Sequence, residues 1–260
     1  MRWWRLTLWM MAWFMTTAQT TYTDEDIKAM KARYERPPRP VISENLPKKL
    51  LERKYEAPRL IDWMLPYQDW EEEYRQYFQR HYRDPRLTFK PSAIVMHYTV
   101  TPDAFSVRNM FVRGCTMSAG DKGTVFGHVS VQLMIGPSGN VYQLLPLDRR
   151  CTGAYGVNHV ALSIEMVARN EAELLSRPDQ VFSSFCLVRS LMRQFDIPAN
   201  KVYAHYEVSA GKSVVSEYTD YADATYPDRY PPASARTDPG KTYMRWLRQY
   251  LARVGPAPQE

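Results

Sequence analysis

The feature that most constrains the fold is a series of short apolar runs that begins at residue 93. Five runs are short, apolar and bounded by turn residues, as is typical of buried strands. They cover residues 93–96, 129–135, 141–145, 161–167 and 201–204. The second and third runs flank the turn sequence GPSG at 136–139, which predicts a β-hairpin.

Two amphipathic patterns accompany these runs. Between the fourth and fifth runs, apolar residues recur at three- and four-residue spacing, which predicts a helix that Pro198 ends. They are Phe182, Phe185, Val188, Leu191, Met192 and Phe195. Met244, Leu247 and Leu251 predict a last helix. Strands and helices therefore interleave, and we expect an α/β fold with a central mixed β-sheet flanked by helices.

A polar segment with many prolines, residues 19–88, precedes this domain. The sequence TDED at 23–26 resembles a helix N-cap and predicts a short helix over 26–34. Apolar residues between 60 and 65 pair at four-residue spacing, which predicts one or two helical turns. A further set recurs every four residues, at Trp70, Tyr74, Phe78 and Tyr82. We expect a helical N-terminal extension whose helices cover the main domain.

The first eighteen residues have the three parts of a secretory signal peptide. Arg2 and Arg5 make a basic start, residues 6–15 are apolar, and the small residues at 16–18 suit cleavage before Gln19. The apolar run of about ten residues is shorter than the roughly 20 that a spanning helix needs. We therefore expect an exported protein, periplasmic or secreted, with no stable membrane insertion after cleavage. An uncleaved anchor is the alternative.

Charge and motifs argue against other classes of partner. The chain carries 34 Lys and Arg residues against 28 Asp and Glu, a net charge of +6 without a long basic run, so we expect no nucleic-acid partner. Neither a GxGxxG motif nor a P-loop sequence occurs, which argues against nucleotide chemistry. Three cysteines allow at most one disulfide among Cys115, Cys151 and Cys186, and a state with all three reduced is the alternative.

Two histidines directly follow strand runs: His97 follows AIVM, and His205 follows KVYA. A side chain at the end of a strand projects from a rigid element, which suits a metal ligand. Asp238, in RTDPG before the last helix, is a third candidate. The three residues are 108 and 33 positions apart, whereas structural zinc sites pair ligands at about two to five residues. A metal bound here would keep an open position, as catalytic zinc does. The competing interpretation is that each histidine is an ordinary core or surface residue.

Five short motifs occur in order: IVMHYT, the hairpin VSVQLMIGPSGNVYQLLP, NHVALSIEMV, AHYE and RTDPG. In this order they resemble the type 2 N-acetylmuramoyl-L-alanine amidases, which are related to the AmpD-like amidases and the peptidoglycan recognition proteins. The resemblance covers residues 92–253. It implies a Zn²⁺ ion held by His97, His205 and Asp238, with Glu165 as a catalytic residue.

The resemblance completes a division of the chain into a signal peptide (1–18), the extension (19–88) and a zinc amidase domain (89–255). Within that domain, residues 206–235 form a Tyr-rich insertion longer than the family commonly carries. Its tyrosines either wall a glycan groove or pack the insertion onto the core. The middle of the hairpin strand lacks the Tyr or His that some family members have there.

Three further residues are assigned through the resemblance. Arg236 stands where the family often has Lys, and Asn158 and His159 match the family's substrate-side loop, so we expect them to contact substrate. Zinc lowers the pKa of a bound water from about 15.7 toward 7. Glu165 would take the proton of that water and pass it to the leaving amine. Arg236 would stabilise the oxyanion, since an arginine keeps its charge but does not give up a proton.

The sequence therefore predicts an exported zinc hydrolase that cuts the amide between N-acetylmuramic acid and L-alanine, in polymeric peptidoglycan or in a muropeptide. One alternative is a recognition module that binds muropeptide without cutting it. Another is a peptidase that acts on a different cell-wall amide with the same metal.

Overall fold

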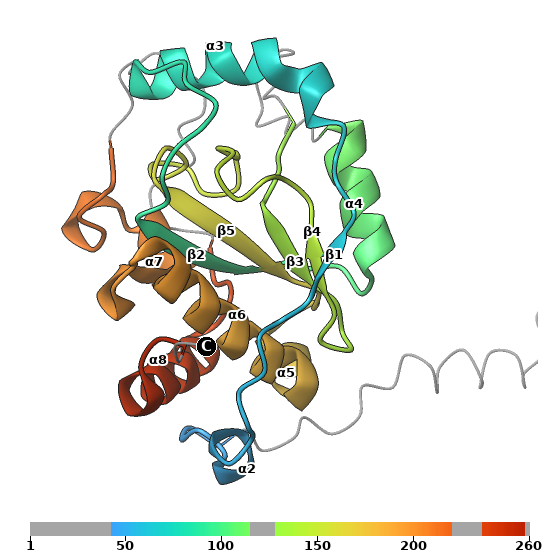
Figure 1. Cartoon of the computed structure of the whole chain (residues 1–260), viewed down its shortest axis with the longest axis vertical. Coiled ribbons are helices and arrows are strands. Elements are labelled where there is room, and N and C mark those ends of the chain that lie inside the picture. The colour runs from blue at the N-terminus through green and yellow to red at the C-terminus, as the bar shows by residue number, and fades with distance from the viewer. Residues whose placement is uncertain (1–42, 115–127, 220–235, 258–260) are drawn as a thin grey trace, which may run out of the picture. The chain divides into compact units, whose positions relative to one another are not determined.

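The structure, a computed structural model, describes residues 43–114, 128–219 and 236–257 (Figure 1). The predicted signal peptide, the predicted helix at 26–34 and Cys115 lie outside these residues. Cys151 and Cys186 are buried free thiols. In the described part of the chain, no helix is both long enough and apolar enough to cross a membrane.

A six-stranded mixed sheet forms the centre, in the order β1-β4-β3-β5-β2-β6. β3 and β4 make the predicted antiparallel hairpin, and the other neighbouring strands pair in parallel. The strands are β1 (Leu60–Asp62), β2 (Ala93–Tyr98), β3 (Leu133–Ile135), β4 (Val141–Gln143), β5 (Ala161–Met166) and β6 (Val202–Ala204). The expected mixed sheet is confirmed, with strands shorter than several of the apolar runs.

Helices flank this sheet. The helix predicted between the fourth and fifth apolar runs is α6, and the predicted last helix is α8. The helices are α2 (Lys48–Leu51), α3 (Glu71–Tyr82), α4 (Ala104–Arg113), α5 (Glu171–Leu175), α6 (Pro178–Phe195), α7 (His205–Ser209) and α8 (Lys241–Val254), with 3-10 turns η1 (Tyr67–Trp70), η2 (Ala199–Lys201) and η3 (Gly211–Ser213). The sequence patterns do not predict α2, α4, α5 or α7.

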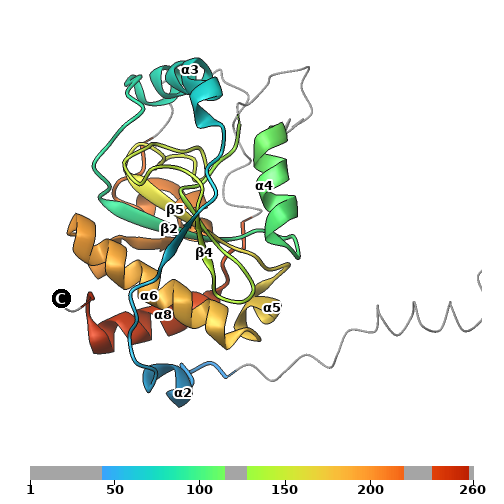
Figure 2. The same cartoon turned by 45° about the vertical axis from the view of Figure 1, so that its right-hand side comes forward.

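Of the three apolar cores in the described part of the chain, the two largest lie on opposite faces of the sheet. On one face lie α6 and α8 (Figure 2). Their apolar side chains share a core with alternate strand residues such as Met96 and Ile164. On the other face, α3 and α4 enclose a second core with Met134 and Leu144. Alternate residues of a strand point to opposite faces, so the strands supply both cores at once. This burial on both faces explains why the strand runs are apolar throughout rather than alternating.

The helical turn predicted between residues 60 and 65 is wrong. Leu60–Asp62 is the edge strand β1, which pairs in parallel with β4. Backbone amides of Trp63 and Leu65 extend this pairing by donating to the carbonyls of Gln143 and Leu144. Two apolar pairs four residues apart fit either element over so short a stretch, and the open edge of the hairpin decides between them. Part of the extension is thus a strand of the main sheet.

The helix predicted from Trp70, Tyr74 and Phe78 is confirmed, because η1 and α3 bury these three side chains. Two arginines from the loop after the hairpin hold this helical segment on the domain. Arg149 pairs with Glu71 at 2.8 Å, and Arg150 pairs with Asp84 at 2.7 Å. α3 therefore covers the domain, as expected.

Candidate metal centre

The three predicted metal ligands come from three separate segments that meet at one edge of the sheet. His97 is the fifth residue of β2, His205 is the first residue of α7 directly after β6, and Asp238 lies just before α8. β2 and β6 are parallel neighbours, with Met96 opposite Ala204. The two histidines therefore leave the sheet side by side.

The distances between the ligand atoms suit zinc. His97 Nδ1 lies 3.0 Å from His205 Nδ1, and Asp238 Oδ2 lies 2.9 Å from His205 Nδ1 and 3.4 Å from His97 Nδ1. Ligand atoms of a tetrahedral zinc, each about 2.0–2.2 Å from the ion, lie roughly 3.3 Å apart. The residues present therefore fit such an ion. Among the described residues, no other group of His, Cys, Asp and Glu side chains converges in this way.

Burial and mutual contact set the charges of these ligands. Burial lowers the pKa of His97, and the neighbouring His205 lowers it further, which favours the neutral imidazole that a metal needs. Burial acts to raise the pKa of Asp238, but hydrogen bonds with His205 and His97 outweigh it, so the net shift is downward. The site thus offers a neutral imidazole at His97 and an ionised carboxylate at Asp238.

Glu165 lies beside His97 in the adjacent strand β5, directly opposite it in the parallel register. Burial raises the pKa of Glu165 to about 7, against the lowering effect of His97. Asp238 raises this pKa further, whereas Arg236 lowers it. A carboxyl that titrates near neutral pH is suited to accept a proton and to give it back.

Arg236 reaches the same site from the loop that carries Asp238. It is partly buried, and its charge acts on Glu165. The next residue, Thr237, has its hydroxyl 3.0 Å from the Tyr98 hydroxyl at the end of β2. This loop thus contacts the His97 strand through the Thr237 hydroxyl and the Asp238 carboxylate, while the charge of Arg236 acts on Glu165 in β5.

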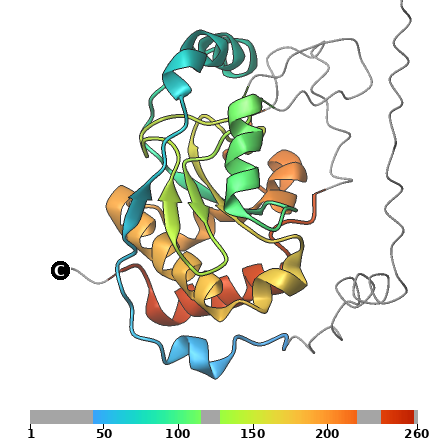
Figure 3. The same cartoon turned by 90° about the vertical axis from the view of Figure 1, so that its right-hand side faces the viewer.

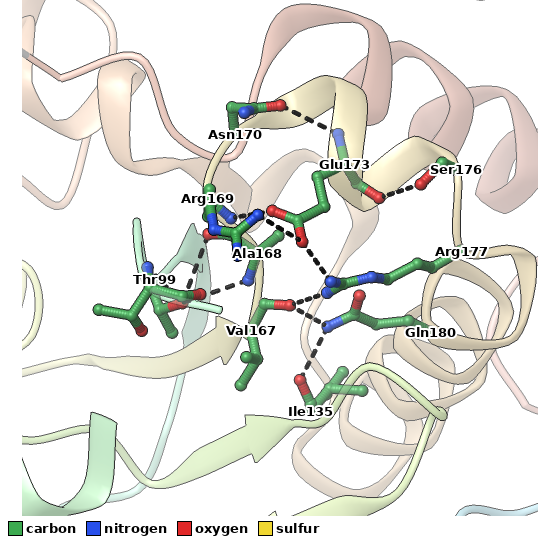
Figure 4. A network of polar contacts seen from close by, with 11 residues as sticks. Thr99, Ile135, Val167, Ala168, Arg169, Asn170, Glu173, Ser176, Arg177 and Gln180 are labelled. Atoms are coloured by element: carbon green, nitrogen blue, oxygen red, sulfur yellow. Dashed lines mark hydrogen bonds and ion pairs between the residues drawn. The ribbon is translucent and has the colours of Figure 1, made fainter. Parts of the chain in front are cut away.

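A polar network holds together the strand ends just beyond His97 and Glu165 (Figure 4). The hydroxyl of Thr99 accepts a hydrogen bond from the Ala168 amide at 3.2 Å. The carbonyl of Val167 accepts from Arg177 at 2.6 Å and from Gln180 at 3.0 Å. Because these bonds fix the ends of β2 and β5, His97 and Glu165 stand on rigid supports.

Glu207 is a supporting residue that the sequence did not reveal. Its carboxylate accepts from the Ala204 amide at 2.9 Å and pairs with Arg248 of α8 at 2.6 Å. The backbone amide of Tyr206 also donates to the Asp238 carbonyl at 3.1 Å. These contacts fix the first turn of α7, where His205 lies. The sequence did contain one signal for this role: an acidic residue two places after His205, where a helix starts, can accept a hydrogen bond from the backbone at that start.

The structure does not bring Asn158 and His159 to the metal ligands. Both precede β5, whereas Glu165 is near its far end, and a strand rises about 3.3 Å per residue. Asn158 is buried; its side chain accepts from the Ala154 amide and donates to the Tyr77 hydroxyl. His159 stacks on Tyr82 at 4.5 Å between ring centroids. Their expected contact with substrate remains a prediction.

The described part of the Tyr-rich insertion ends at Thr219. Tyr218 packs so closely on Gly156 that a Cβ at that glycine would overlap its ring. The amide of Thr219 donates to the Gly156 carbonyl at 2.9 Å. These contacts show that Tyr218 packs onto the core. Tyr221, Tyr226 and Tyr230 lie outside the described residues.

Together, the fold and the site define an α/β protein with a candidate catalytic metal centre at the edge of its sheet. The chain belongs to the N-acetylmuramoyl-L-alanine amidase family, because the model of that family matches residues 87–241. This match covers more than half of the chain and contains all of the predicted site residues.

Solved structures similar to this chain carry related descriptions. The N-acetylmuramoyl-L-alanine amidase LysC from Clostridium intestinale is 20% identical, over 65% of this chain and 88% of its own, with a TM-score of 0.42. A mutant endolysin from Bacillus subtilis is 17% identical, over 60% and 88%, with a TM-score of 0.40. The Drosophila peptidoglycan recognition protein SA is 19% identical, over 47% and 72%, with a TM-score of 0.36. No curated protein sequence matches the chain.

Proposed function

We propose that this protein is an exported zinc hydrolase that cuts the amide between N-acetylmuramic acid and L-alanine in peptidoglycan. The observation that carries the proposal is the convergence of His97, His205 and Asp238 beside Glu165, in a member of this amidase family. Ligands for one ion and a carboxyl beside them are the groups that metal-assisted amide hydrolysis requires.

His97 and His205 would hold zinc through Nδ1, and Asp238 would hold it through a carboxylate oxygen. When bound, zinc supplies Lewis acidity, which lowers the pKa of a water toward about 7 and polarises a carbonyl. Three protein ligands leave one position of a tetrahedral ion free for this chemistry. The polar network supports the ends of β2 and β5, the strands that carry His97 and Glu165.

Glu165 would accept the proton of the attacking water and pass it to the leaving nitrogen. In the metal-free protein its pKa is raised to about 7, which supports a carboxyl that can both accept and return a proton near neutral pH. Glu165 is adjacent to a ligand strand but is not one of the three converging ligands. We therefore assign it a role in proton transfer and not in holding the ion.

Arg236 would stabilise the negative charge that develops on the carbonyl oxygen of the scissile amide. The effect of its charge on the pKa of Glu165 supports this role. Arginine stays protonated throughout, so this residue stabilises charge without donating a proton.

The domain limits and the localisation belong to the same proposal. Residues 1–18 would direct export and be removed, residues 19–88 would form the extension, and residues 89–255 would form the amidase domain. The substrate would then be peptidoglycan or muropeptide outside the cytoplasm, in the periplasm or the surrounding medium.

Digestion of purified sacculi, followed by mass spectrometry of the released products, tests the proposal. Stem peptides with a free N-terminal L-alanine are expected. Cleavage at another amide of the stem would instead identify a peptidase. Binding to sacculi without any product would identify a recognition module.

A further inference from the structure

The start of α8 depends on a residue from another helix. α8 begins at Lys241, directly after the Asp238 loop, and the residue before it is Gly240, which has no side chain to cap the helix. The backbone amides of Thr242 and Tyr243 instead donate to Oε1 of Glu171, at 2.6 and 2.9 Å. The first amides of a helix need such an acceptor, and a negative charge there is favourable.

Gly240 and Glu171 are built closely against each other. A Cβ at position 240 would overlap the Glu171 carboxyl group. Gly240 also has a φ of +102°, a backbone conformation that favours glycine. Only glycine at position 240 leaves room for the Glu171 side chain at this distance.

Glu171 comes from the segment that leaves the Glu165 strand. It is the first residue of α5, six positions after Glu165 in the sequence. α5 and α8 lie side by side (Figure 3). One carboxylate thus connects the chain that follows the predicted base to the loop that carries the third predicted ligand.

We infer that Glu171 is a positioning residue that holds Asp238 in place for metal binding. This inference rests on the proposed zinc site and names a residue outside the ligand set. Without the Glu171 carboxylate, two amides at the start of α8 lose their acceptor. The Asp238 loop then keeps its contacts with Tyr206 and Tyr98 but loses the anchor at its α8 end. Residues that orient metal ligands without touching the ion typically change metal affinity by about 10–100-fold when they are removed.

Glu173 provides a matched control on the same short helix. Its carboxylate accepts from the Arg169 amide at 2.8 Å and pairs with Arg177 (Figure 4). These contacts stay within the segment around α5 and do not involve the Asp238 loop. Loss of Glu173 therefore disturbs α5 without removing the anchor of α8.

The test is a competitive zinc titration of the full chain with a chromophoric chelator. Glu171→Ala should weaken zinc binding by about tenfold or more. Glu171→Gln keeps an acceptor oxygen and should stay close to the parent. Glu173→Ala should weaken zinc binding clearly less than Glu171→Ala, because Glu173 reaches the strand ends only through Arg177. Amide hydrogen exchange of the metal-free proteins gives a second readout. Residues 238–245 should exchange faster in Glu171→Ala than in Glu173→Ala.

Two results would overturn the inference while leaving the zinc site intact: parent-like affinity in Glu171→Ala, or equal weakening in Glu173→Ala. If Glu171→Ala folds poorly, parent-like exchange over 238–245 in its folded fraction would also contradict it. A parent protein that binds no zinc would instead contradict the proposed metal site, and the inference would fall with it.

Discussion

His97 and Glu165 lie opposite each other in the parallel pairing of β2 and β5. Paired residues of neighbouring strands point to the same face, so the predicted ligand and the predicted base share one side of the sheet. This register makes the carboxyl of Glu165 a neighbour of the metal ligands without making it a fourth ligand. The roles of the two residues are therefore separable by mutation.

Glu165→Gln should keep zinc and lose turnover. The amide keeps the shape of the side chain but cannot accept the proton, so the rate should fall by about 10²–10⁴. Zinc content and turnover on sacculi, measured on the same preparation, check this. Loss of zinc in this variant would show that the carboxylate is a ligand and that Asp238 needs re-examination.

Glu165 should also make the metal-free protein less stable as the pH rises. Its pKa is raised from 4.5 to about 7 in the folded state, so the folded protein binds a proton that the unfolded chain has released. Stability is therefore lost between these pH values, and Glu165→Gln escapes the loss. Urea unfolding with a chelator present should show the variant more stable than the parent by roughly 1–3 kcal/mol at pH 8. The difference should shrink toward pH 5, and a difference that stays constant with pH would argue against the raised pKa.

Arg236 should act through its charge. Arg236→Lys keeps a cation and should retain much of the activity, whereas Arg236→Ala should lose about 10²–10³ in turnover. Turnover on sacculi, with zinc content as the control for folding of the loop, distinguishes the two variants. A fully active Arg236→Ala protein would reduce Arg236 to a loop residue.

Asp84 should contribute stability that acid removes. A hydrogen bond with Arg86 holds the pKa of this carboxyl well below its usual range, and a hydrogen bond with Arg150 adds a smaller lowering. A lowered pKa gives stability that is present above about pH 4 and lost as the pH falls below it. Asp84→Asn should lose roughly 1–3 kcal/mol at pH 7 and much less at pH 3. The exposed Asp148→Asn is the control, and an equal effect of both substitutions would remove the special role of Asp84.

Export predicts a shortened chain. The mature protein should begin near Gln19, because residues 6–15 and the small residues that follow suit cleavage there. N-terminal sequencing of the protein recovered from outside the cytoplasm checks this. An intact Met1 on a soluble cytoplasmic protein would contradict both the signal peptide and the localisation.

The sequence predicts best the parts of the site that strands carry. His97, Glu165 and His205 each lie within or directly after an apolar run, and parallel strands bring such positions to one edge of a sheet. These three residues lie close together because the strands that carry them are neighbours in the sheet and alternate residues of a strand point to the same face. The short edge strand Leu60–Asp62 could not be predicted in the same way, since only the open side of the hairpin makes it a strand.

Contacts between distant segments could not be predicted. Glu171 reaches amides more than 70 positions away, and no local pattern around either segment announces that contact. The same applies to Asn158 and His159, which lie at the far end of β5 from Glu165. A motif match fixes a residue's order along the chain, whereas its distance from the predicted metal ligands depends on how the intervening loop folds.

The central claim is a zinc site made by His97, His205 and Asp238, and the metal content of purified protein tests it most directly. The parent should hold about one zinc per chain, as one tetrahedral site requires. His97→Ala, His205→Ala and Asp238→Ala should each lose most of it. His159→Ala, which removes an imidazole at the other end of β5, should keep it. Near-stoichiometric zinc in all three ligand variants would contradict the assignment.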